Sequence, residues 1–95
     1  MDTGLLEQFT RLRIMVVLYR HRDVAARRLR DDLGLTDGNL ASHATRLMEA
    51  GWLRSRTALE KTGFELRYTI TADGSAALRE HLERLRSLIG DADLA

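Results

Sequence analysis

One short stretch of the sequence gathers small and hydrogen-bonding residues that could together bind a polar, charged partner: Thr36, Gly38, Asn39, Ser42, His43, Thr45 and Arg46. On a helix over about residues 36–50 with Leu40 turned inward, a rotation of about 100° per residue places most of these residues on the opposite, exposed face. Arg46 could then form two parallel hydrogen bonds to guanine, and Asn39 could form two to adenine. This face therefore has the chemistry needed to read base edges in double-stranded DNA.

The other residues of this face have less specific roles. Ser42 and Thr45 can bond bases or phosphates, and Gly38 would let the backbone approach a phosphate near the positive end of the helix. His43 lies on the flank, about 60° from the core direction, where it either packs against a neighbour through a hydrogen bond or contacts a phosphate. The structural alternative is that any exposed helix face carries polar residues. Glu49 fits that alternative, because phosphates repel a carboxylate.

A second group of cations lies in a predicted hairpin over about residues 52–71: Arg54, Arg56, Lys61 and Arg67. Pairing Leu59 with Phe64 gathers the apolar side chains on one face of the hairpin and places Arg56 opposite Arg67 on the other face. Like charges directly across a sheet are destabilising, so this pair needs a counter-charge. DNA phosphate and the nearby Glu65 are equally good candidates, and Arg54 and Lys61 are further candidates for phosphate contacts.

Three helices are predicted ahead of the hairpin. The first covers about residues 3–20, with a bend near Thr10 as one alternative. Its apolar stripe, widened by Met15 and Leu18, is expected to face the core: Leu5, Phe9, Leu12, Val16 and Tyr19. Asp23 is expected to cap a second helix that ends at Gly34, and Thr36 to cap a third helix that ends at Gly51. Two helices joined through a short Gly-Leu-Thr turn are typical of a helix-turn-helix, in which the third helix is the recognition helix.

After Gly51 the period of the apolar residues changes from 3.6 to 2, which predicts two strands joined by a loop at residues 60–63. Thr71 or Asp73 is expected to cap a last helix over about residues 72–90. The predicted fold class is mostly α with some β: a winged helix-turn-helix of three helices, a two-stranded wing hairpin and a C-terminal helix. Because no linker or repeat divides the chain, residues 1–95 are predicted to form a single domain.

The two ends of the chain carry more apolar side chains than a core of this size is expected to cover: Leu5, Leu6, Phe9, Leu78, Leu82, Leu85 and Ile89. On the last helix their spacing of four, three and four residues forms a narrow seam of the coiled-coil kind. Burying one leucine contributes roughly 1.5–3 kcal/mol, so the terminal helices are expected to pair with those of a second copy. Such a homodimer would place two recognition helices about one DNA turn apart.

Composition argues against several other classes of function. The 95 residues contain no cysteine, which excludes disulfides, thiolate metal sites and cysteine nucleophiles. The three histidines fall in different predicted elements and outside any nucleophile–base motif, so no enzymatic activity, cofactor or metal site is expected. His81, between Glu80 and Glu83, is expected to be solvated or at an interface. No apolar run approaches the about 20 residues that span a membrane, and a cytoplasmic protein is expected.

The net charge of +1 divides unevenly along the chain. The first seventy residues carry twelve Lys and Arg against nine Asp and Glu, whereas the remaining twenty-five carry three against five. The uneven division favours a DNA partner, while the low total charge favours the alternative of a winged helix used only for protein–protein contact. Part of the arginine excess is expected to be neutralised locally, because Arg27 and Arg28 precede Asp31 and Asp32 by four residues.

Four stretches of the sequence carry a family resemblance: Arg11-Leu12-Arg13-Ile14, Leu35-Thr36-Asp37-Gly38-Asn39-Leu40, Glu49-Ala50-Gly51-Trp52-Leu53 and Arg67-Tyr68-Thr69-Ile70-Thr71-Ala72-Asp73-Gly74. Over about residues 9–82 the chain resembles the small winged-helix DNA-binding proteins related to the MarR-type and ArsR-type transcriptional regulators. The resemblance implies a cytoplasmic homodimer whose third helix enters the major groove and whose wing touches the backbone or the minor groove. A small-molecule effector would be compatible with it, but no residue identifies one.

Overall fold

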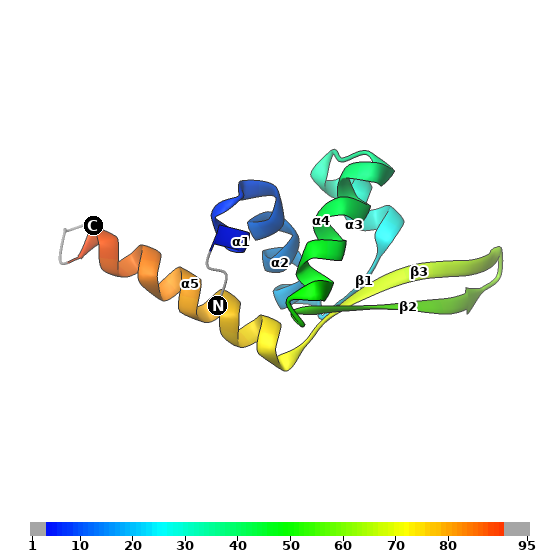
Figure 1. The fold of residues 1–95 in the computed structure, drawn as a ribbon. Coiled ribbons are helices and arrows are strands. Elements are labelled where there is room, and N and C mark those ends of the chain that lie inside the picture. The colour runs from blue at the N-terminus through cyan, green and yellow to red at the C-terminus, as the bar shows by residue number, and fades with distance from the viewer. Residues whose placement is uncertain (1–3, 91–95) are drawn as a thin grey trace.

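A computed structural model describes residues 4–90 and shows five helices and three strands (Figure 1), in the order α1 (Gly4–Glu7), α2 (Phe9–His21), β1 (Asp23–Ala25), α3 (Ala26–Leu33), α4 (Asp37–Glu49), β2 (Leu53–Glu60), β3 (Gly63–Ile70) and α5 (Ala72–Ile89). The β2–β3 hairpin, the wing, projects to one side of the helices, and α5 leaves in the opposite direction. The described chain is accordingly elongated, with extents of 51 × 28 × 21 Å. The predicted α+β winged helix is confirmed.

The helix-turn-helix consists of α3 and α4, and local signals set its boundaries. Gly34 ends α3 with a φ of +67°, a left-handed conformation that glycine adopts without a steric cost. Thr36 caps α4, because its side-chain oxygen accepts a hydrogen bond from the backbone N–H of Asn39 at 3.0 Å. Thr71 caps α5 in the same way through the N–H of Gly74. These predicted helix starts and the end of α3 are confirmed.

The N-terminal segment differs from the single predicted helix. It breaks at Gln8, whose side-chain oxygen accepts a hydrogen bond from the Arg11 N–H at 2.9 Å and so caps α2. The buried face of α2 consists of Ile14, Met15 and Leu18. The predicted stripe was wrong about the ends of this face, because the side chains of Phe9 and Tyr19 are exposed. The rest of the predicted face is confirmed, since Met15 and Leu18 are buried and Leu12 and Val16 pack against the core.

The sheet contains a third strand that the sequence pattern did not predict. Strand β1 pairs antiparallel with β3, which gives the order β1-β3-β2. Asp23, expected to cap α3, instead lies in β1 opposite Thr69, and α3 begins at Ala26 without a side-chain cap. The predicted register of the wing is confirmed, and it places Arg56 opposite Arg67.

The core lies between the helices and the inner face of the sheet, and it takes in residues from both ends of the described chain. Leu5, Leu6 and Leu78 belong to it, with 8%, 2% and 1% of their surface exposed. The expectation that these three leucines face a partner is therefore corrected, because α1 and the start of α5 pack against α2 within one chain. Phe9, Leu82, Leu85 and Ile89 stay exposed in the monomer.

The joint between the wing and α5 is packed too closely for a side chain. A Cβ on Gly74 would lie 2.2 Å from the carbonyl oxygen of Trp52, which is backbone and cannot move aside. The same carbonyl accepts a hydrogen bond from the Thr71 N–H, and the Trp52 N–H donates to the Leu47 carbonyl, both at 3.0 Å. Trp52 thereby connects α4, the wing and α5, so Gly74 holds the recognition helix and the wing in one arrangement.

Candidate nucleic-acid interface

Helix α4 buries one face and presents the other to solvent. Leu40, Ala44 and Leu47 are buried, as the sequence predicted. The polar residues of the opposite face are exposed: Thr36, Gly38, Asn39, Ser42, Thr45 and Arg46. The Thr36 hydroxyl oxygen is engaged in the helix cap, whereas no neighbour lies within 4 Å of a Cβ built on Gly38. The N-terminal turn of α4 is thus open to close approach by a ligand.

Three of the candidate cations have no partner within the part of the chain that the structure describes. Among residues 4–90, no ion pair or side-chain hydrogen bond involves Arg46 on α4, Arg54 on β2 or Lys61 at the wing tip. All three side chains are exposed. Their positive charge is therefore available to an anionic partner without first breaking a contact within the chain.

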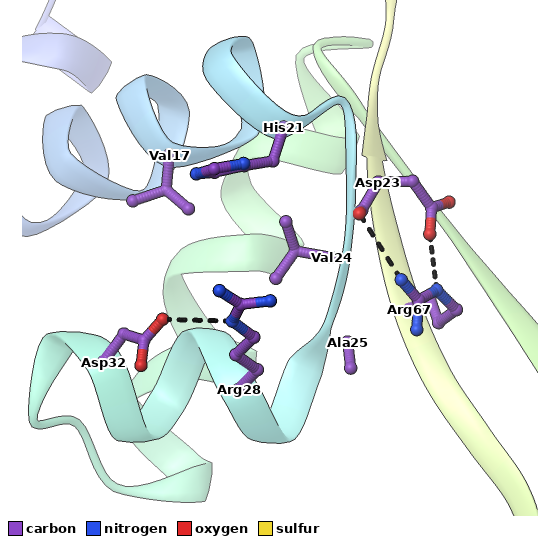
Figure 2. Close-up of a pocket in the computed structure, with 8 residues that line it drawn as sticks. All are labelled: Val17, His21, Asp23, Val24, Ala25, Arg28, Asp32 and Arg67. Atoms are coloured by element: carbon purple, nitrogen blue, oxygen red, sulfur yellow. Dashed lines mark hydrogen bonds and ion pairs between the residues drawn. The ribbon is translucent and has the colours of Figure 1, made fainter.

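The two facing arginines of the wing are instead bound to Asp23 on the added strand. Arg56 donates to the Asp23 carboxylate from Nε at 3.0 Å and from Nη2 at 3.2 Å, and Arg67 donates to it from Nε. Thr69 donates its hydroxyl to the same carboxylate at 2.6 Å. The hydrogen bonds from Arg56, Thr69 and Arg67 hold the pKa of Asp23 well below its usual range. Figure 2 shows Arg67 turned toward Asp23 across the β1–β3 pair.

Asp23 was missed as the counter-charge for Arg56 and Arg67, for which DNA phosphate and Glu65 were the two candidates. Glu65 supplies part of it, because it accepts a hydrogen bond from Arg67 Nη1 at 3.0 Å. Glu65 also accepts one from Arg27 at 3.4 Å. The only local sign of this role was an acidic residue just before the apolar pair Val24-Ala25, and that pattern also fits a helix cap.

The arginines of α3 are also bound to carboxylates. Arg28 pairs with Asp32 at 3.4 Å as predicted. Arg27 forms its ion pair with Glu65, and its predicted interaction with Asp31 is limited to its positive charge, which helps to lower the pKa of that carboxyl. Arg30 binds Asp31 and also Asp37 at the first turn of α4, each at 2.8 Å. The hydrogen bond to Asp31, and to a lesser extent the one to Asp37, raises the pKa of Arg30. Arg30 thus connects α3 to the start of the recognition helix.

His43 is half-buried on the flank of α4 and bonds to Arg11 of α2. Arg11 Nη1 lies 3.2 Å from His43 Nδ1, and this supports the predicted packing role without testing a phosphate contact. Burial lowers the pKa of His43, and the positive charges of Arg11 and Arg46 lower it further. His43 is therefore held in its neutral form near pH 7.

A polar pocket of 290 Å³ lies between α2, β1 and α3, lined by Val17, His21, Asp23, Val24, Ala25, Arg28, Asp32 and Arg67. Figure 2 shows that its charged groups are matched in pairs, with Arg28 on Asp32 and Arg67 on Asp23. A ligand would have to displace these contacts, so the pocket does not single out a ligand. Within residues 4–90, no group of three His, Asp or Glu side chains is arranged to hold a metal ion.

Exposed apolar side chains gather on α5, and one more lies at the start of α2. The exposed residues are Phe9, Leu82, Leu85, Leu88 and Ile89. An adjoining apolar pocket of 320 Å³ between α1 and α5 is lined by Glu7, His81, Arg84, Leu85, Ser87 and Leu88. His81 is 5% exposed, so of its two predicted environments the solvated one was wrong, and the interface stays a prediction. No helix within residues 4–90 combines the length and apolar character that crossing a bilayer requires.

Comparison with known proteins agrees with this arrangement. A family model described as a winged helix DNA-binding domain matches residues 10–89. The chain is 28% identical to an uncharacterized protein of Methanocaldococcus jannaschii over 78 residues, 82% of this chain and 85% of that protein. It is also 28% identical to a transcriptional regulator homologue from Pyrococcus horikoshii OT3, whose structure superposes with a TM-score of 0.89 over 99% of this chain and 93% of that one.

Solved structures of lower sequence identity share only their fold with this chain. A mutant MarR from E. coli complexed with operator DNA is 17% identical with a TM-score of 0.70, covering 86% of this chain and 55% of that one. The reduced form of the regulator YodB from B. subtilis is 16% identical with a TM-score of 0.77, covering 97% and 89%. The expected winged-helix resemblance is confirmed, and with most of its length matched, this chain belongs to the winged helix DNA-binding domain family.

Proposed function

We propose that this chain is a cytoplasmic transcriptional regulator that binds double-stranded DNA sequence-specifically as a homodimer, with α4 in the major groove. The observation that carries the proposal is the exposed face of α4, on which Arg46 has no counter-charge among the described residues. A cation without an internal partner loses no existing contact when it binds DNA. The family match and the DNA-bound structure of the fold support the same partner.

Each residue of the α4 face has a role suited to its chemistry. Arg46 pairs with guanine and Asn39 with adenine, whereas Ser42 and Thr45 bond bases or phosphates. Gly38 lets a phosphate approach the first turn of α4, where backbone N–H groups and the helix dipole favour an anion. Thr36 contributes by fixing that turn through its cap. Base contacts then supply specificity, and phosphate contacts set the register.

The wing divides its cations between two tasks. Arg54 and Lys61, which are exposed and without partners among the described residues, bind phosphates of the backbone beside the major groove or along the minor groove. Arg56 and Arg67 shape the wing through Asp23 and contribute little to DNA affinity, because a phosphate would have to compete with a bound carboxylate. The proposal therefore narrows the phosphate-binding part of the wing to Arg54 and Lys61.

The homodimer uses the apolar surface of α5 together with Phe9. Four large side chains of α5 are exposed there, and Phe9 is 68% exposed. Each leucine that a partner buries contributes roughly 1.5–3 kcal/mol. Leu5, Leu6 and Leu78 support the interface from within the core rather than by contact with the partner. A Leu82→Glu, Leu85→Glu variant is expected to sediment as a folded monomer, and an unaltered dimer would move the interface elsewhere.

The experiment that tests the function is selection of bound duplexes from a random pool, followed by titration of the selected duplex with wild type and with Arg46→Ala. Wild type is expected to enrich a short pseudo-palindrome. Arg46→Ala is expected to lose about 1–3 kcal/mol of binding free energy and to relax the preference at one base pair of each half-site. Arg20→Ala, which removes an exposed cation at the end of α2, is the control for total charge.

A second candidate function is a protein-contact module without DNA binding, and the wing tip favours it. Leu59 and Phe64 face each other across the strands and are 73% and 78% exposed, as large apolar side chains at a protein interface would be before binding. This candidate predicts no enriched duplex and no dependence of binding on salt. An enriched duplex whose affinity falls steeply with salt excludes it.

A further inference from the structure

Arg11 joins three parts of the N-terminal half of the molecule. Its Nε donates a hydrogen bond to the Leu5 carbonyl at 2.8 Å, which reaches back into α1. Its Nη1 lies 3.2 Å from Nδ1 of His43 on α4. The guanidinium is half-buried and has no carboxylate partner among the described residues. Arg11 is therefore a link between α1 and the recognition helix rather than a solvated surface charge.

The contact fixes which nitrogen of His43 carries the proton. A guanidinium has only donors, so His43 Nδ1 must accept the hydrogen bond and must be unprotonated. A neutral imidazole then carries its proton on Nε2. Burial and the charges of Arg11 and Arg46, the cations that act on the ring from α2 and from α4, keep the pKa of His43 lowered and the ring neutral. His43 is thus a hydrogen-bond donor through Nε2–H alone.

The Nε2–H group has no partner among the described residues and is available to a ligand. It donates no hydrogen bond to any residue from 4 to 90. It is also not buried, so a ligand can reach it. On α4, His43 is four residues after Asn39 and three before Arg46, so the three side chains are neighbours along the helix surface. His43 therefore shares a helix surface with the two residues assigned to base contacts.

Resting on the DNA-binding function proposed above, we propose that Arg11 is a positioning residue that fixes His43 as an Nε2–H donor to a phosphate oxygen or a base acceptor of the bound duplex. The same contact ties α1, which packs beside the dimer surface, to the recognition helix. Protonation of His43 would place an Nδ1–H against the Arg11 guanidinium and break this contact. DNA affinity is accordingly expected to change as the pH falls through the pKa of His43.

The first part of the test uses the DNA-free protein, so it does not depend on the proposed function. Long-range ¹H–¹⁵N spectra of the imidazole rings are expected to show His43 as the Nε2–H tautomer at neutral pH. In Arg11→Met the spectra are expected to show a mixture of tautomers and a raised pKa for His43. Arg13→Met is the matched control, since Arg13 lies on the same helix and bonds weakly to the Leu33 carbonyl. An Nδ1–H tautomer in wild type would overturn the proposal.

The second part measures affinity for the selected duplex. His43→Phe removes the donor and is expected to bind about tenfold more weakly, whereas His43→Gln keeps an N–H near the position of Nε2 and is expected to recover most of that loss. Arg11→Met is expected to weaken binding about as much as His43→Phe. Arg11→Lys replaces Arg11→Met if the latter fails to fold, because lysine can reach Leu5 or His43 but not both.

The outcomes separate the two proposals. If wild type selects no duplex, both the DNA-binding function and the role of His43 are overturned. If wild type binds a duplex and His43→Phe binds it equally well, only the role of His43 and Arg11 is overturned. A loss in His43→Phe that His43→Gln does not recover would also overturn it, because that pattern reports packing rather than a donated hydrogen bond.

Discussion

Helix α4 and the wing both place arginines on the outer surface, but the wing binds two of its three arginines to a carboxylate. Arg46 has no partner among the described residues, whereas Arg56 and Arg67 share the Asp23 carboxylate. A count of cations along the sequence would credit the wing with more DNA-binding capacity than the helix. The arrangement of carboxylates reduces the wing's share to Arg54 and Lys61, because a cation already bound has less to gain from a phosphate.

The difference has a cause in sheet geometry. Arg56 and Arg67 are directly opposite on neighbouring strands, where like charges repel. Strand β1 brings Asp23 to the β3 edge opposite Thr69, within reach of both guanidinium groups. Asp23 thus holds the two wing arginines in place. Arg46 of α4 faces no like charge across a strand, so it needs no such carboxylate and stays available to a ligand.

Disrupting the packing of Gly74 against Trp52, which connects α4 and the wing, is expected to have the largest effect on stability. Gly74→Ala would push a methyl group against the Trp52 carbonyl, and overpacking of this kind costs about 3 kcal/mol of unfolding free energy. Denaturant unfolding measures it. Gly38→Ala, where the added methyl meets nothing within 4 Å, is the matched glycine control; equal losses in both variants would contradict the packing argument.

Removing the counter-charge of the wing is expected to have the next largest effect. Asp23→Asn keeps the shape of the side chain but leaves Arg56 and Arg67 facing each other, which should cost about 1–2 kcal/mol of stability. Arg56 would then be free to bind a phosphate, whereas Arg67 keeps its ion pair with Glu65, so the slope of log affinity against log salt should steepen by about one unit. Titration at several salt concentrations measures the slope. An unchanged slope would mean that Arg56 does not face DNA even when free.

A substitution on α4 separates folding from binding. Gly38→Ala is expected to keep or raise stability by up to about 1 kcal/mol, because alanine favours a helix more than glycine does. DNA affinity is expected to fall nevertheless, since the methyl group would stand where a phosphate approaches the first turn. Thermal unfolding and duplex titration measure the two effects, and a variant that binds as tightly as wild type would remove Gly38 from the interface.

The smallest effect on stability is expected from lowering the pH. The pKa of Asp23 is lowered in the folded protein, so its contribution to stability is complete above the unfolded value of about 3.9 and is lost as the pH falls below it toward the folded pKa. Unfolding followed between pH 6 and pH 2.5 should show this loss. Asp23→Asn should show a shallower decline over the same range, and an identical decline would assign the effect to other carboxylates.

The features predicted correctly from sequence depend on neighbours in the chain. Thr36, Gly34 and Thr71 set helix boundaries through bonds within a few residues, and the alternation around the hairpin determined its register. The inward face of α4 followed from helical period alone. Such features are readable because the physical cause lies in the same short segment.

The features that were missed join segments far apart. Asp23 and Arg56 are 33 residues apart, and Arg11 and His43 are 32 apart. No local pattern distinguishes an aspartate that caps a helix from one that binds two arginines of a distant hairpin. The burial of Leu5 and Leu6 depends likewise on how α1 packs against α2, which helical spacing does not determine.

The central claim is that the free arginine of α4 binds DNA and the paired arginines of the wing do not. The most direct test compares Arg46→Ala with Arg56→Ala for affinity to the same selected duplex at the same salt concentration. Arg46→Ala is expected to bind about 5–150-fold more weakly, the equivalent of about 1–3 kcal/mol, and Arg56→Ala within about threefold of wild type. An Arg56→Ala variant that loses as much affinity as Arg46→Ala would contradict the account.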